Sequence, residues 1–155
     1  VEVGLVAAEV GAETRYGYRH PLVAETVYES IPAALRRTLH GEVAAALEQQ
    51  YGGQAGPWLA VLAEHTLRAG QQEAASRHFL TAARYAHGRY ATQEAVALYR
   101  QALATAPAAE AGPAFDPKLA LAIREPLGEV LALSGAYDGA RAQFEALLAQ
   151  LERLG

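Results

Sequence analysis

The chain has 155 residues, of which 52% are hydrophobic and 19% are charged, and this composition excludes a disordered or polyelectrolyte protein. Its 13 basic and 17 acidic residues give a formal net charge of −4, which disfavours a nucleic-acid-binding domain. Cysteine is absent, so disulfides and thiolate zinc sites are excluded. Charged residues interrupt every apolar stretch well before the ~20 residues that a membrane span needs, and we expect a cytoplasmic protein.

The first twenty residues favour a short β-hairpin. Tyr16 and Tyr18 alternate with Gly17 and Arg19, which is the period of two typical of a strand. A turn-like segment at 10–13 precedes them. Because an isolated two-stranded hairpin is marginally stable in water, we expect it to pack on other structure. We therefore divide the chain into a hairpin at 1–20 and a helical domain at 21–155.

From Pro21 onward the period becomes helical. The sequence holds 36 alanines, mostly in stretches poor in β-branched residues, which favours helices. Pro126 should kink or divide the helix that contains it near Arg124. The second helix should be amphipathic, with a stripe at Leu35, Leu39, Val43 and Leu47. The pattern predicts seven helices, at about 21–30, 31–51, 58–69, 72–88, 92–105 and 118–133, and from the turn at 134–138 to about 154.

Three segments repeat one spacing, in which a small residue is followed four positions later by an aromatic one. In two of them a glycine also stands five positions before the small residue. Such a glycine ends a helix in a left-handed turn, the small residue lets two helices approach, and the aromatic ring fills the gap. The residues expected to pack in this way are Gly70, Ala75, Phe79, Ala95, Tyr99, Gly128, Gly135, Ala140 and Phe144.

This spacing resembles the tetratricopeptide repeat, strongly at 127–147, well at 62–82 and partially at 95–107. The register is irregular, and the helix before Tyr90 should serve two neighbouring hairpins. The resemblance implies an all-α superhelical array of about seven helices arranged as helix hairpins. Together with the N-terminal β-hairpin, this is the fold that we expect.

A second resemblance covers about residues 3–105. It is carried by short motifs that also occur in large bacterial signal-transduction ATPases of the AAA/STAND type, fused to class III adenylate cyclase domains or to LuxR-type DNA-binding domains. The resemblance implies a helical-repeat sensor arm, and it implies that residues 1–20 are the wing of a winged-helix domain. The motifs are Tyr18–Val23, Val27–Ile31, Arg36-Arg37, Leu39-His40, Ala63–His65, Ala69-Gly70, Ala82-Ala83 with Ala86, Tyr90-Ala91, Glu94-Ala95 and Leu98-Tyr99.

Catalytic and cofactor motifs are missing from the sequence. The glycine run at 52–57 lacks the lysine and hydroxyl of a phosphate-binding loop, so we interpret it as a helix-breaking loop. No two of the 5 histidines stand four residues apart, and His40 and His65 are interpreted as packing or capping residues. Glu125 and Glu129 are one turn apart but are better explained as a solvated face. We expect neither enzymatic activity nor a cofactor or metal.

Two kinds of binding surface remain open. Trp58, Tyr85, Tyr90 and Tyr137 either belong to the core or line a concave groove for a peptide or partner helix. Alternatively, Tyr85, Arg89 and Tyr90 line a pocket for a small-molecule effector.

Contact with DNA through the N-terminal hairpin is the weakest hypothesis. It would use Arg15 and Arg19. The net charge favours ion pairs of these residues with Glu25 and Glu29 instead.

The function we expect from the sequence is regulated protein–protein interaction. The chain would be the sensor or scaffold arm of a multidomain bacterial signalling or transcription regulator, and its partner would be another protein or other domains of the same chain. The apolar end at 144–154 would either continue into further sequence or form a homodimer. The alternatives, in order, are an effector-binding helical domain and DNA contact through the hairpin.

Overall fold

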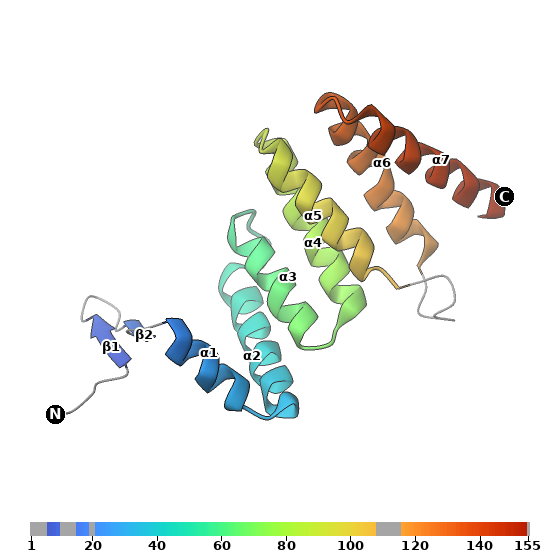
Figure 1. Cartoon of the computed structure of the whole chain (residues 1–155). Coiled ribbons are helices and arrows are strands. Elements are labelled where there is room, and N and C mark those ends of the chain that lie inside the picture. The colour runs from blue at the N-terminus through green and yellow to red at the C-terminus, as the bar shows by residue number, and fades with distance from the viewer. Residues whose placement is uncertain (1–5, 10–14, 19–20, 108–115, 155) are drawn as a thin grey trace. The chain divides into compact units, whose positions relative to one another are not determined.

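The computed structural model describes residues 6–9, 15–18, 21–107 and 116–154. The chain divides into two compact units, Val1–Arg36 and Arg37–Gly155. The described residues contain seven helices, so the predicted helical class is confirmed (Figure 1). The elements are β1 (Val6–Glu9), β2 (Arg15–Tyr18), α1 (Pro21–Ser30), α2 (Ala33–Tyr51), α3 (Trp58–Arg68), α4 (Gln72–Gly88), α5 (Thr92–Thr105), α6 (Pro117–Leu133) and α7 (Tyr137–Leu154).

The first unit contains the two short strands, α1 and the start of α2, up to Arg36. Strand β1 pairs with β2 in the antiparallel sense, and the register places Val6 opposite Tyr18 and Glu9 opposite Arg15. Helix α1 follows and ends at Ser30, next to the Ile31-Pro32 sequence that disfavours a continued helix. The guanidinium of Arg36 lies 5.1 Å from the centre of the Tyr28 ring, a cation–π contact inside this unit.

The same tight turn occurs three times in the second unit. After α3, the Gly70 amide donates to the Leu67 carbonyl at 2.9 Å, and the Gln71 amide donates to the Thr66 carbonyl at 3.2 Å. This pair of bonds defines a Schellman turn, whose central residue adopts a left-handed conformation. The same pattern of bonds joins α4 to α5 and α6 to α7. The residues at the left-handed position are Gly70 (φ +86°), Tyr90 (φ +61°) and Gly135 (φ +81°).

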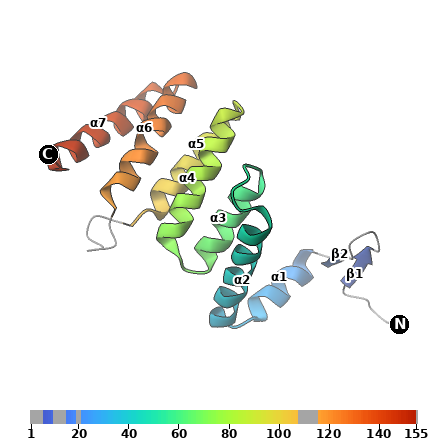
Figure 2. The same cartoon turned by 180° about the vertical axis from the view of Figure 1, so that it is seen from behind.

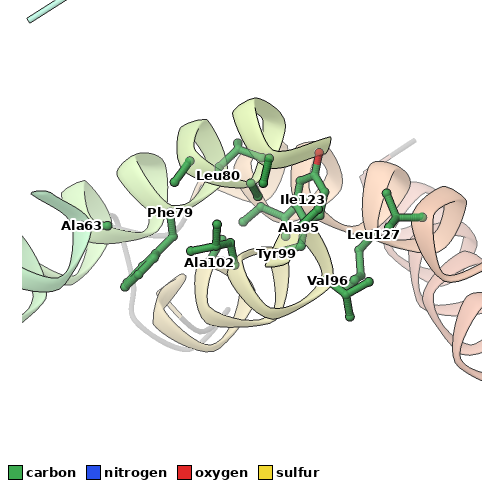
Figure 3. Packing of buried hydrophobic residues seen from close by; sticks show 14 of the residues in the cluster. Ala63, Phe79, Leu80, Ala95, Val96, Tyr99, Ala102, Ile123 and Leu127 are labelled. Atoms are coloured by element: carbon green, nitrogen blue, oxygen red, sulfur yellow. The ribbon is translucent and has the colours of Figure 1, made fainter. Parts of the chain in front are cut away.

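The core of this unit lies along the contacts between successive helices. Five residues after each left-handed position stands a buried alanine, namely Ala75, Ala95 or Ala140. Phe79 and Tyr99 follow four residues after the first two of these alanines and are each 1% exposed. Figure 3 shows Ala95 and Tyr99 of α5 next to Ile123 of α6, and Phe79 of α4 on the side of Ala63 of α3. Small residues therefore let the helices approach, and aromatic rings fill the remaining space.

Polar contacts also hold the helix pairs together. Helix α4 packs against both α3 and α5, and α6 packs against α5 and α7; Figures 1 and 2 show these neighbours side by side. The buried Ser76 hydroxyl donates to the Ala102 carbonyl at 2.8 Å, which links α4 to α5. Asp116 caps α6 by accepting from the Lys118 amide at 3.0 Å, and its other carboxylate oxygen accepts from Arg77 of α4 at 2.9 Å.

The structure corrects two predictions. The sequence predicts either a kink or a division of α6 near Arg124, and the division is wrong, because α6 is one helix that continues through Pro126. The buried Ile123 and Leu127 on either side of the proline hold the helix against its neighbours, which offsets the missing backbone hydrogen bond. In α2 the buried side chains are His40 and Ala44. The predicted apolar stripe is instead exposed at Leu35, Leu39 and Val43. Helix α2 meets α3 through the neighbouring line of residues that contains His40.

Candidate functional site

Two open cavities flank Arg84, a residue of α4 that lines both of them. Their volumes are about 510 Å³ and about 410 Å³, within the range of small-ligand and peptide-anchor sites. The side chain of Arg84 is exposed, and it makes no hydrogen bond or ion pair with any residue that the structure describes. A free guanidinium between two cavities is available to an anionic group of a ligand.

The larger cavity, here called the Trp58 cavity, is formed by the end of α2, the glycine-rich loop after it, the start of α3 and one face of α4. The Trp58 indole stacks on the Tyr51 ring with centroids 5.5 Å apart and an angle of 20° between planes. A Cβ added at Gly56 would stand 2.6 Å from the indole Nε1, so the loop needs glycine at this position. The glycine run thus positions an aromatic wall.

Charged and polar groups also line the Trp58 cavity. His78 Nε2 lies 3.3 Å from the Glu48 Oε1. Burial lowers the pKa of His78, and the Glu48 carboxylate opposes that shift. The Tyr85 hydroxyl accepts a hydrogen bond from Arg89 Nη1 at 3.0 Å, and the same guanidinium lies 5.2 Å from the centre of the Tyr85 ring. Arg89 therefore holds Tyr85 in place without lining the cavity itself.

The smaller cavity, here called the Tyr90 cavity, is bounded by three helices. Tyr99 forms its floor and is 1% exposed. Its hydroxyl has no hydrogen-bond partner within the described part of the chain. Burial raises the pKa of Tyr99, the Arg84 charge opposes the shift and the Glu129 charge adds to it, so the phenol stays a neutral donor. The full lining is Arg84, His87, Gly88, Tyr90, Thr92, Tyr99, Val130 and Leu133.

The aromatic residues singled out in the sequence lie at three different places. Trp58 and Tyr85 share the larger cavity, and Tyr90 lines the smaller one. Tyr137 is 72% exposed and lines neither of them.

The side chains of the two arginines proposed for DNA contact lie outside the described part of the structure. Arg15 lies in β2, where only the backbone is described, and Arg19 falls outside the described residues. The structure therefore places neither a DNA contact nor the alternative ion pairs with α1.

Sequence reasoning missed a histidine pair and the second role of Tyr99. His40 of α2 and His65 of α3 face one another with their Nδ1 atoms 3.0 Å apart. Burial and the Arg68 charge lower the pKa of His65, and the Glu64 charge opposes them. Each histidine stands in a short motif, but a single sequence does not reveal that two motifs 25 positions apart meet. The repeat spacing predicts a core position for Tyr99 and carries no signal for its place in a cavity.

The described residues contain no group of three or more histidine or carboxylate side chains arranged to hold a metal ion. Their helices are also too short or too polar to cross a lipid bilayer.

Comparisons with known proteins supply one relative. An uncharacterized protein of Rhizobium meliloti (strain 1021) is 35% identical over 99 residues, a stretch that covers 64% of this chain and 10% of that protein. The matched segment is therefore about a tenth of the relative's length. No protein-family model matches the chain. No solved structure matches it either.

Proposed function

We propose that this chain is the non-catalytic interaction and sensor arm of a larger cytoplasmic bacterial regulator, with a tetratricopeptide-like architecture. The same Schellman turn occurs three times, and a buried alanine follows each left-handed position by five residues. This repetition supports the repeat architecture. A relative in which the matched segment is 10% of the length supports an arm within a much longer protein. The resemblance to signal-transduction ATPases fused to cyclase or LuxR-type domains supports a role in signalling or transcription.

The observation that carries this proposal is the Trp58 cavity. It joins an aromatic wall to an unpaired guanidinium, while its own acid, Glu48, is engaged by His78. Amphipathic surfaces of this kind anchor peptides through one apolar side chain and one charged group. The partner we propose is an extended segment of another protein, or of another domain of the same chain. It would place an apolar side chain against Trp58 and a carboxylate near Arg84.

The test uses the single tryptophan as its reporter, since Trp58 is the only one in the chain. Peptides selected by phage display on the immobilised chain are titrated against it while the Trp58 emission is followed. We expect saturable binding that Tyr85→Ala weakens about tenfold, as for an interface aromatic. Tyr137→Ala is the matched control, because that ring is exposed and outside both cavities. Equal effects of the two variants, or no saturable peptide, would contradict the proposal.

The second candidate function is binding of a small-molecule effector. It is favoured by one specific observation, the unpartnered Tyr99 hydroxyl at the floor of the Tyr90 cavity. A phenol in that position donates to a ligand or to water. The two candidate functions use different cavities, which share Arg84 of α4 but no other lining residue, so each can fail without the other.

A further inference from the structure

We infer that the Tyr90 cavity is a binding site for a small aromatic carboxylate, held by Tyr90, Tyr99 and Arg84. This inference rests on the second candidate function and names the ligand class. Three independent observations support it: the backbone of Tyr90, the hydroxyl of Tyr99 and the charge of Arg84.

Tyr90 occupies a backbone position that disfavours it. Its φ is +61°, and it is the one non-glycine residue with positive φ among the residues that the structure describes. The equivalent positions of the other two turns are Gly70 and Gly135, which adopt this conformation without a steric penalty. The Tyr90 side chain is 91% exposed, so packing inside the free protein does not offset the strain. Strain of this kind concentrates at ligand-binding positions.

Tyr99 offers a hydrogen-bond donor at the same cavity. The residue is 1% exposed, and its oxygen, the red atom in Figure 3, ends a side chain that otherwise lies in the core. Tyr99 lines the cavity, and no described residue makes a hydrogen bond with its hydroxyl. The hydroxyl is not one of the fully buried polar atoms that lack a partner, so it is open to the cavity and can donate to a molecule held there. An acceptor atom of a bound ligand would satisfy it.

The charge at the cavity favours an anion. Arg84 contributes a guanidinium without an ion pair in the described chain, and His87 and the Thr92 hydroxyl lie on the same lining. The carboxylate of Glu129 on α6 also acts on Tyr99 through space. A ligand anion therefore belongs on the α4 side, next to Arg84. A carboxylate suits a planar guanidinium that presents two parallel donors.

The remaining lining defines the body of the ligand. The Tyr90 ring and the side chains of Val130 and Leu133 form an apolar rim, and Leu133 is 80% exposed. A ring lying against Tyr90 would cover this exposed apolar surface and gain a stacking contact. The volume of about 410 Å³ suits a compound with one ring and a short acidic side chain. Together these groups describe a phenylacetate-like or benzoate-like molecule.

The experiment titrates the chain with benzoate, phenylacetate and 4-hydroxyphenylacetate, followed by ligand-detected NMR and calorimetry. Benzamide and phenylacetamide are the matched neutral probes, and acetate is the probe without a ring. We expect at least one of the aromatic carboxylates to bind saturably and its amide to bind at least tenfold more weakly. Failure of all three carboxylates to saturate, or equal binding of acids and amides, would overturn the inference.

Variants assign the binding to this cavity. Tyr99→Phe should weaken binding about three- to tenfold, and Arg84→Gln about tenfold or more. Arg100→Gln is the matched control, since Arg100 is exposed on α5 and lines neither cavity. Tyr90→Gly should raise Tm and at the same time weaken binding of the carboxylate. A residue with a purely structural role would not stabilise the protein and weaken binding together. Binding unchanged in Tyr99→Phe and Arg84→Gln would overturn the site, whatever the peptide experiment shows for Trp58.

Discussion

The ring of Phe144 on α7 lies directly over the backbone of Gly128 on α6. A Cβ added at Gly128 would stand 2.8 Å from two ring carbons of Phe144 and 3.1 Å from a third. Glycine in a helix interior costs about 0.5–1 kcal/mol relative to alanine. The close approach of the two helices at this point explains why the sequence carries that cost.

The first prediction follows from this contact. Gly128→Ala should lower the free energy of unfolding by about 1–3 kcal/mol, because the ring and the helix must separate to admit a methyl group. Gly139→Ala is the matched control on α7. Its added Cβ would meet Leu131 at an ordinary 3.5 Å, so it should be neutral or stabilise by up to about 1 kcal/mol. Urea denaturation of both variants checks the difference in sign.

The second prediction concerns the three Schellman turns. Gly70→Ala and Gly135→Ala should each destabilise the protein by about 1 kcal/mol, since a Cβ is strained at their φ of +86° and +81°. Tyr90→Gly should stabilise it by a similar amount for the same reason. Thermal denaturation followed by circular dichroism measures all three. Destabilisation by Tyr90→Gly would show that the exposed ring stabilises the free protein.

The third prediction is a loss of stability in mild acid. The pKa values of His65 and His78 are lowered from 6.5 in the folded protein, mainly by burial. The unfolded chain therefore binds protons more readily than the folded one below about pH 6.5. Above about pH 6.5 both histidines are neutral in the folded and the unfolded chain, and the free energy of unfolding does not depend on them. As the pH falls from there toward the lowered pKa values, protons bind to the unfolded chain first and the free energy of unfolding decreases.

The measurement for this prediction compares urea denaturation at about pH 7.5 and about pH 5.5, on either side of the ordinary histidine pKa. The free energy of unfolding should decrease less between these two pH values in His65→Gln than in the wild-type protein. His87→Gln is the control, on a histidine outside both the His40–His65 pair and the contact with Glu48. An unchanged pH dependence in His65→Gln would remove that histidine as a source of the effect.

The fourth prediction separates the two bonds of Asp116. Asp116→Ala removes the cap of α6 and the ion pair with Arg77, and should cost about 1 kcal/mol. Asp116→Asn keeps a capping oxygen and should cost less, because exposed ion pairs contribute little. The Arg77 hydrogen bond holds the pKa of Asp116 below its ordinary value, so this stabilisation disappears only in strong acid. Added salt should reduce the difference in the free energy of unfolding between the wild-type protein and Asp116→Asn, because salt screens the ion pair with Arg77.

The helix boundaries could be predicted because their signals are local. Gly70, Gly135 and the Asp116-Pro117 pair each mark a helix end through their own backbone preferences. The turn at Tyr90 also ended a helix where expected, but its left-handed backbone could not be predicted, since tyrosine does not favour that conformation.

The site depended on distant pairings that one sequence does not reveal. Both cavities are formed by residues from three helices each, so only the packed array brings Trp58 to Tyr85 or Tyr90 to Tyr99. The buried face of α2 was missed for a similar reason. A leucine stripe predicts an apolar face, but the neighbouring line with His40 meets α3.

The double contact of Asp116 has a consequence for how the array folds and opens. In a linear array, each helix pair has an intrinsic stability and a coupling to its neighbours. The Asp116 carboxylate contributes to both terms, because it caps α6 and also binds Arg77 on α4. Loss of this carboxylate therefore weakens the α6–α7 pair and also its coupling to α4. Amide hydrogen exchange in the Asp116 variants should then reveal α6 and α7 opening as one cooperative unit before α3–α5 open.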